Sequence, residues 1–189
     1  MAGKFWTDAN TEPKRNYRFR VQIGSTDDQF GVIWYAKSAD KPKFDQDVLE
    51  HDFLNHKFKF PGRIKWSDVT VVLVDAVSPD AMQRTLKILQ SSGYRIPNTP
   101  SVHGQQDTGT MSKQMAVDAL KSVTITQLDA NGNWLEEWQL TNAFLKNAEF
   151  EKLDYGNEDM STITLTLAYD YATCQFPLGE SITFGSESP

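Results

Sequence analysis

Residues 160–171 contain the pattern that most constrains the fold, an alternation of apolar and polar side chains. Because successive side chains on a strand point to opposite faces, this period of two predicts a β-strand with one buried face. At about 3.3 Å per residue the segment would span about 40 Å, longer than a usual strand. The apolar face comprises Ile163, Leu165, Leu167, Tyr169 and Tyr171, and the polar face comprises Thr162, Thr164, Thr166 and Asp170.

Several further segments show strand-like patterns and are separated by residues typical of turns. Residues 30–38 carry large side chains on both faces, so both faces of that strand must be covered. The Asn131-Gly132 pair is the strongest local signal of a hairpin. The chain is therefore predicted to be mainly β. The expected strands are 17–23, 30–38, 66–75, 121–128, 134–140 and 160–171, with a short one at 144–150.

One helix is predicted with clear boundaries, over residues 79–92. Ser78 is a suitable N-cap, Pro79 suits the first helical position and Gly93 ends the segment. Residues 112–120 fit either a short helical turn or an irregular strand. The helix carries an apolar stripe at helical spacing, which indicates that it lies on a sheet or barrel. The stripe comprises Met82, Leu86 and Leu89.

Residues 40–65 form a long polar and aromatic excursion between two predicted core strands. Phe53, Phe58 and Phe60 are interspersed with polar side chains, and Pro61-Gly62 makes a turn. This composition is typical of a protruding hairpin. The chain is accordingly divided into an N-terminal arm over residues 1–15, one β domain over 16–174 and a C-terminal tail over 175–189.

Composition limits the kinds of partner. With 189 residues the chain fits one domain that needs no disulfide or metal to fold. Its net charge of -6 argues against a general nucleic-acid binder. Cys174 is the only cysteine, which fits folding in a reducing cytoplasm. No apolar signal region and no run near the ~18 residues of a membrane span is present, so we expect neither classical secretion nor membrane insertion.

The residues that usually carry catalysis or bind metals lack the required spacing. No phosphate-binding glycine motif occurs. His51 and His56 would point to opposite faces of a strand, which suits no metal site. Glu136 and Glu137 would also face apart, as solvated or interfacial charges rather than an acid/base pair. Cys174 has no nucleophile signature and is expected to be an apolar filler. We expect no catalytic, cofactor-binding or metal-binding residue.

The remaining candidates for function are surfaces, and each has two interpretations. Phe5 and Trp6 are adjacent aromatics that either dock onto a partner or fold back on their own core. Arg18 and Arg20 share a strand face that is either solvated or meets acidic groups of a neighbouring subunit. The threonine face of residues 162–166 is either an exposed strand face or a polar wall that lines a pore.

Two segments, in their order along the chain, carry a likeness to a known family. The first is Gly62-Arg63-Ile64-Lys65-Trp66-Ser67-Asp68-Val69-Thr70-Val71, followed by Asp75 and by a helix that opens with Asp80-Ala81. The second is Leu153-Asp154-Tyr155 with the strand 163–171. The strand 121–128 and the Asn131-Gly132 hairpin lie between them in the expected order. Over residues 15–175 the chain thus resembles tail tube proteins of contractile-tailed, T4-like bacteriophages.

The resemblance implies a fold and a function. The fold would be two packed antiparallel sheets, a β-sandwich or distorted barrel, with one flanking helix. Six copies would form a ring whose inner sheets join, and stacked rings would carry DNA inside a contractile sheath. The tube would be part of a virion assembled in the host cytoplasm, with sheath, baseplate and tail terminator as partners. The hairpin residues expected to contact the next ring are Phe44, Phe53, Phe58, Phe60 and Arg63.

Three alternatives stay open at this point. Within the same family, the chain could be a baseplate protein that initiates the tube, or the tube subunit of a secretion or injection system. A monomeric β-sandwich module that binds peptide, carbohydrate or nucleic acid is a second alternative. A hydrolase that uses Cys174 is the third, and the variant Cys174→Ala would abolish its activity.

Overall fold

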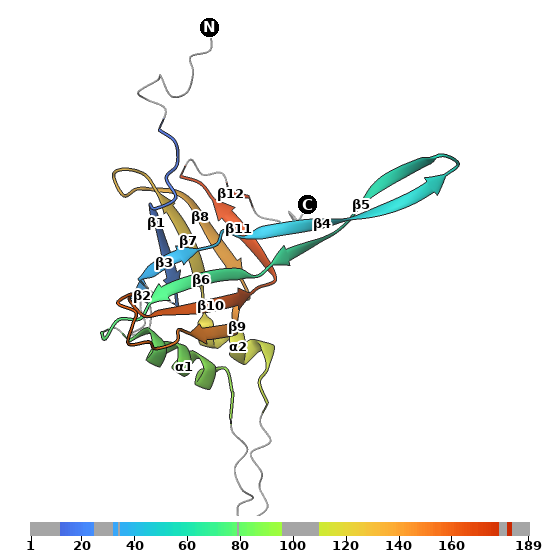
Figure 1. The fold of residues 1–189 in the computed structure, drawn as a ribbon. Helices are drawn as coiled ribbons and strands as arrows, with labels where there is room; N and C mark the ends of the chain where they lie inside the picture. The colour runs from blue at the N-terminus through green and yellow to red at the C-terminus, as the bar shows by residue number, and fades with distance from the viewer. Residues whose placement is uncertain are drawn as a thin grey trace, which may run out of the picture.

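The computed structural model describes residues 12–24, 32–33, 35–78, 80–95, 110–177 and 181–182, and Figure 1 shows their arrangement. The two helices of this part of the chain are α1 (Ala81–Ser91) and α2 (Lys113–Leu120). Its strands are β1 (Phe19–Ile23), β2 (Val32–Ile33), β3 (Ala36–Ala39), β4 (Lys43–Phe53), β5 (His56–Ser67), β6 (Val69–Val74), β7 (Val123–Leu128), β8 (Trp134–Thr141), β9 (Phe144–Phe150), β10 (Thr162–Ala168), β11 (Tyr171–Gln175) and β12 (Ser181–Ile182).

The strands form three antiparallel sheets, which confirms the prediction of a mainly-β fold. Sheet A has the order β12-β11-β8-β7-β1-β2, and sheet B has the order β3-β6-β10-β9. Strands β4 and β5 pair only with each other among the described strands and form a long hairpin. The described strands do not close into a barrel, so the sandwich alternative describes the body of the molecule better.

The hydrophobic core lies between sheets A and B. Sheet B contributes Leu165 and Val71, which face each other across β10 and β6 and are fully buried. Sheet A contributes Val21 and Val123, which are also buried. The threonines of β10 alternate with these core residues and are half-buried on the opposite face of sheet B. The period of two predicted for this strand is therefore correct.

The predicted strand 160–171 is too long at its C-terminal end. β10 ends at Ala168, and the chain then turns to join sheet A as β11. Asp170 holds this corner, because its carboxylate accepts hydrogen bonds from Lys113 Nζ at 2.7 Å and from Asn142 Nδ2 at 2.7 Å. Tyr171 consequently lies on an exposed position and not on the predicted apolar face.

The prediction for helix α1 is wrong about its cap and its buried face. Asp80 is the N-cap, and its carboxylate accepts a hydrogen bond from the backbone N–H of Gln83 at 2.8 Å. The buried side chains are Ala81 and Thr85, one position before the predicted stripe. One residue rotates a helix face by about 100°, so Met82 and Leu86 point away from the core and are exposed.

Residues 112–120, which the sequence left open, include the second helix. Ser112 caps α2 by accepting a hydrogen bond from the backbone N–H of Met115 at 3.2 Å. α1 and α2 contact each other and both contact β9, at the lower end of the body in Figure 1. Two helices flank the sheets, where the sequence predicted one. Across the described ranges, neither helix is long and apolar enough to span a membrane.

Candidate functional site

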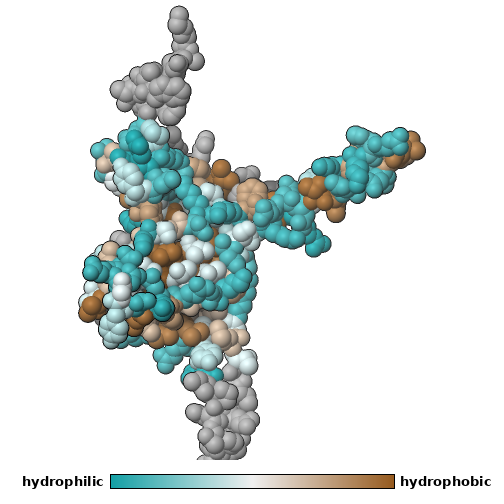
Figure 2. All heavy atoms as spheres, in the orientation of Figure 1, coloured by the Kyte–Doolittle hydropathy of each residue, from teal (hydrophilic) through white to brown (hydrophobic). Residues whose placement is uncertain are grey.

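The β4–β5 hairpin is the most exposed element of the molecule. Nearly every residue of both strands is exposed, and Figure 1 shows the hairpin extending away from the body. An isolated two-stranded hairpin is at best marginally stable in water, so a hairpin of this length is expected to need a partner. Figure 2 shows apolar residues near its tip and along its length among hydrophilic ones. The large exposed apolar side chains are Phe44, Val48, Leu49, Phe53, Leu54, Phe58, Phe60 and Ile64.

A register shift divides the hairpin into two halves. In the half nearest the body, Phe44 faces Trp66 across the strands at 5.5 Å between ring centroids. Trp66 in turn contacts Tyr169 of the body at 6.0 Å. Phe44 therefore belongs to the base of the hairpin, which separates it from the other aromatic residues predicted to make contacts between rings.

Beyond the register shift the hairpin has one aromatic and one charged face. The cross-strand pairs of the aromatic face are Leu49 with Phe60, His51 with Phe58 and Phe53 with His56, and those of the charged face are Glu50 with Lys59 and Asp52 with Lys57. The ion pairs of the charged face are exposed and 3.4–3.9 Å long, so they add little stability. His51 and His56 share the aromatic face, because the tip turn separates them. The prediction that they point to opposite faces is wrong.

Gly62 makes the register shift possible. A Cβ atom at this position would lie 2.7 Å from the backbone oxygen of Asp47 on the facing strand. No real Cβ atom approaches a backbone oxygen so closely, so the facing strand would have to move. The close approach of the two backbones explains why a glycine stands here.

We expect Gly62→Ala to loosen the hairpin and to leave the body folded. Hydrogen exchange of β4 and β5 amides should accelerate at least about tenfold, which corresponds to about 1.4 kcal/mol. The core amides of β10 should exchange as before. Gly156→Ala is the matched control, because its Cβ would find no atom nearer than 3.5 Å. Unchanged exchange rates in the hairpin of Gly62→Ala would contradict this account of the register shift.

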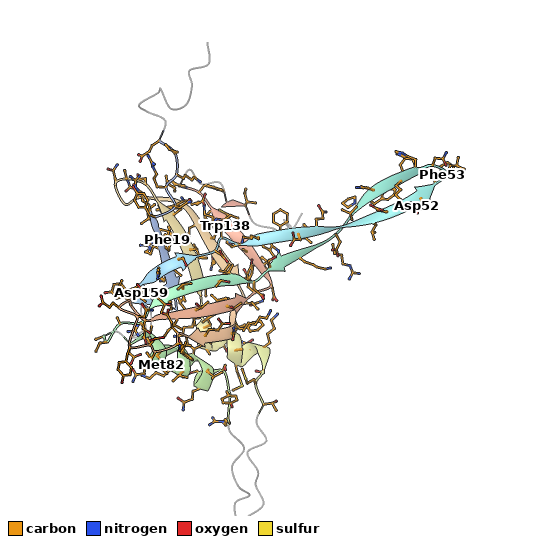
Figure 3. All side chains as sticks on the ribbon, in the orientation of Figure 1. Phe19, Asp52, Phe53, Met82, Trp138 and Asp159 are labelled. Carbon is orange, nitrogen blue, oxygen red and sulfur yellow. The ribbon has the colours of Figure 1, made fainter. Side chains whose placement is uncertain are left out.

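The tip of the hairpin presents a strained and exposed leucine. Leu54 has a φ of 53°, in the left-handed region that disfavours side chains with a Cβ, and it is 90% exposed. Its neighbour Phe53 is 59% exposed, and Figure 3 shows Phe53 at the far end of the hairpin. Backbone strain of this kind costs about 1 kcal/mol or more and often marks a functional contact. No pattern in the sequence points to Leu54, since a leucine carries no turn signal.

An open cleft of about 710 Å³ lies between the two sheets, beside β3. Figure 3 labels Phe19 and Trp138 at this place in the body. The cleft has an aromatic and aliphatic wall with lysines and one buried carboxylate. Its principal lining residues are Tyr17, Phe19, Lys37, Lys41, Ile125, Glu136 and Trp138.

Glu136 lies in this cleft between two lysines. Its carboxylate accepts hydrogen bonds from Lys14 and Lys41, and Lys41 also binds Gln127 Oε1 at 2.6 Å. Burial raises the pKa of Glu136, but the two lysines outweigh burial and hold its pKa below the usual value. Glu137 points to the other face of sheet A, where it accepts a hydrogen bond from Thr126. The two glutamates face apart as predicted, but Glu136 is buried and not solvated.

We expect Glu136→Gln to reduce the free energy of unfolding at pH 7, because the substitution removes the charge that pairs with Lys14 and Lys41. Both lysines are half exposed, which limits the loss to about 1–2 kcal/mol. A carboxylate whose pKa is lower in the folded state stabilises the fold. This contribution is complete above the unfolded-state pKa, near 4.5, and is lost as the pH falls through the folded-state pKa. The difference between the two proteins should therefore shrink as the pH approaches 3. Urea unfolding at both pH values measures it, and an equal difference at both would contradict the ion-pair account.

The other predicted contact residues lie apart from the hairpin and the cleft. Arg18 is bound to Glu12 within the chain at 2.6 Å, while Arg20 is exposed on β1. Arg18 comes just before β1, and its backbone oxygen accepts a hydrogen bond from the backbone N–H of Leu128 on β7 at 3.0 Å. Phe5 and Trp6 lie outside the described residues.

The described residues contain no cluster of side chains suited to hold a metal ion. No group of three or more His, Cys, Asp or Glu side chains gathers within them. Cys174 is buried, and burial raises the pKa of its thiol, whereas a nucleophilic cysteine needs a lowered pKa.

One family model matches the sequence, and several solved structures share the fold. The family described as T4-like virus tail tube protein gp19 matches residues 15–173. A chain from the sheath-tube complex of an extracellular contractile injection system in its extended state, PVC, is 18% identical with a TM-score of 0.62, over 93% of this chain and 99% of that one. No curated protein matches.

Two further solved structures share this fold. A chain from the tube-terminating cap of the anti-feeding prophage is 21% identical with a TM-score of 0.62, over 93% of this chain and 99% of that one. A chain from the baseplate of the same particle is 14% identical with a TM-score of 0.58, over 87% of this chain and 97% of that one. At these identities the likeness establishes the fold.

Proposed function

Because the chain belongs to the T4-like virus tail tube protein family, whose members are structural tube proteins, we propose that six copies close into a ring and that rings stack into the inner tube of a contractile tail. The tube conducts phage DNA into the host during contraction. It is assembled in the host cytoplasm and becomes part of the virion. The protein performs no catalysis in this role and needs no cofactor.

The observation that carries this proposal is the open architecture of sheet B. Within the described strands, β3 and β9 each pair on one side only, so neither edge has a further strand partner, although α1 and α2 contact β9. All pairs in the sheet are antiparallel, and the order β3-β6-β10-β9 places antiparallel strands at its two edges. A second copy can therefore join its β3 to β9 and continue the antiparallel pattern, which removes the hazard of exposed edges. Such a head-to-tail contact closes into a ring when the rotation is right.

The outer face of sheet B is suited to line the tube. Thr162, Thr164 and Thr166 lie on it and remain half-buried in the single subunit. Hydroxyl groups offer DNA neither cationic binding nor an apolar surface, so the polyanion could slide past. We infer that these threonines face the lumen. The two helices pack against β9.

The hairpin supplies the contact between successive rings. Phe53, Phe58 and Phe60 would act as anchors there, and Arg63 would add a contact nearer the base of the hairpin. Arg20, and the Phe5 and Trp6 pair of the arm, would contribute to contacts around the ring. The sheath, baseplate and tail terminator are the further partners proposed, since chains of this fold occur in a sheath-tube complex, a terminating cap and a baseplate.

A second candidate is the tube of an injection system, because the similar solved structures come from such particles. Native mass spectrometry at increasing protein concentration tests the feature that both candidates share. We expect a species of six 21.4 kDa chains and its multiples. A protein that stays monomeric when concentrated, with and without added baseplate, would overturn the proposal in favour of a binding module.

A further inference from the structure

The segment that follows the N-terminal arm is fixed to the wall of the cleft beside β3. Lys14 is bound by Glu136, and the backbone oxygen of Arg15 accepts a hydrogen bond from Gln127 Nε2 at 3.3 Å. Glu136 and Gln127 both line the cleft. The arm that precedes these residues is therefore tethered at the cleft itself.

The cleft has space and an apolar wall for a further chain segment. Its volume is about 710 Å³, and the side chains of Phe19, Ile125 and Trp138 line it (Figure 3). The Nε1 atom of Trp138 is buried and has no hydrogen-bond partner within the described residues. An N–H group in this state is costly, so a segment that packs here and supplies an acceptor would be bound more tightly.

The arm carries a suitable pair of side chains within reach. Phe5 and Trp6 are adjacent, and Trp6 precedes Lys14 by eight residues. Eight extended residues span about 26 Å at about 3.3 Å per residue, which lets the pair fold back onto the cleft. Each of these aromatic side chains can bury about 150–250 Å² of surface. Docking of the pair would cover apolar surface on the arm and on the cleft wall.

The short tether favours the arm of the same chain as the occupant. Short tethers give an effective concentration on the order of millimolar, which is far above the concentration of a dilute subunit. The arm of a second copy would have to compete with this intramolecular contact. The chain's own arm is therefore the occupant that the structure favours.

One wall of the cleft is the strand that the proposed ring uses as a contact edge. All four residues of β3 line the cleft. Among the described strands, β3 pairs only with β6. A segment packed between β3 and sheet A would support this edge strand on the side of the cleft.

We propose that Phe5 and Trp6 fold back into the cleft between β3 and sheet A of their own chain and hold β3 in position for pairing with a second copy. The docking concerns the single chain, whereas its effect on ring closure rests on the proposed function and deepens it. The arm then contributes to contacts around the ring by fixing the strand that makes them.

Disulfide trapping in the dilute full-length subunit tests the docking. Thr7→Cys, next to the aromatic pair, is combined with Lys37→Cys on the exposed rim of the cleft, and the buried native Cys174 is kept. With added oxidant we expect a disulfide within one chain. The matched control adds Phe5→Ser and Trp6→Ser to the same cysteine pair. It keeps the tether and should cross-link at least about tenfold more slowly.

Each other result of this experiment overturns the inference. Equal rates with and without the two aromatic rings would mean that the tether alone explains the cross-link. Cross-links between chains would show that the arm docks on another copy. Faster cross-linking of Thr183→Cys than of Thr7→Cys with the cysteine at position 37 would assign the cleft to the C-terminal tail. Failure of the unmodified protein to form rings would overturn the proposed function and leave the docking standing.

Hydrogen exchange tests whether the docked arm holds β3. The backbone N–H of Asp40 donates a hydrogen bond to the backbone oxygen of Thr70 at 2.9 Å, directly after β3. Phe5→Ser with Trp6→Ser should accelerate exchange of this amide at least about tenfold and leave the core amides of β10 unchanged. Thr7→Ser is the control on the same arm and should change neither. Unchanged exchange at Asp40 in the double variant would contradict the proposal.

Discussion

A subunit without its hairpin is expected to fold and form rings but not to stack. The sharpest variant replaces residues 47–63 by Asn-Gly, a tight turn that joins the paired positions Gln46 and Ile64. The removed residues are exposed and contribute nothing to the core between sheets A and B. The Phe44–Trp66 contact at the base is retained.

Removal of the hairpin is expected to abolish the stacking of rings almost completely. Without Phe53, Leu54, Phe58 and Phe60 the subunit loses the exposed apolar surface at the hairpin tip, so stacking should stop at single rings. Sedimentation velocity should show rings of one size, and the melting temperature of the dissociated subunit should change by less than about 3 °C, the effect of about 1 kcal/mol. Long tubes from this variant would show that another surface connects the rings.

A substitution in the core should act in the opposite way, on folding before assembly. Leu165 is completely buried in β10, between Val71 on β6 and Ala148 on β9. Leu165→Ala removes apolar contacts and leaves a cavity, which is expected to reduce the free energy of unfolding by about 3–4 kcal/mol. For a chain of this size the melting temperature should fall by about 10 °C.

Thr164→Ala is the matched control for this prediction. Thr164 neighbours Leu165 but lies half-buried on the opposite face of sheet B. Its loss should cost less than about 1 kcal/mol in urea unfolding of the subunit. Equal destabilisation by both variants would mean that the two faces of β10 are misassigned.

Local patterns in the sequence predicted much of the fold. The alternation in β10, the turn at Asn131-Gly132 and the polar-aromatic composition of residues 40–65 each depend on neighbouring residues. Steric and hydrophobic effects of this short range can be deduced from spacing alone. The confirmed mainly-β class follows from such patterns.

The features that were missed depend on contacts between distant segments. Met82 and Ala81 are both apolar and adjacent, so packing against α2 and β9 decides which face of α1 is buried. The corner at Asp170 requires Lys113, 57 residues earlier in the chain. Glu136 is held by Lys14 and Lys41, which have no spacing relation to it. These residues come together only after folding, so no local pattern could reveal the cleft.

Electron microscopy of the concentrated, unmodified protein tests the central claim most directly. The account predicts rings with sixfold symmetry, an open centre and, at higher concentration, hollow tubes of uniform width. Added baseplate should nucleate tubes from any subunits that remain free. Particles without rotational symmetry, or monomers that persist in the presence of baseplate, would contradict the account.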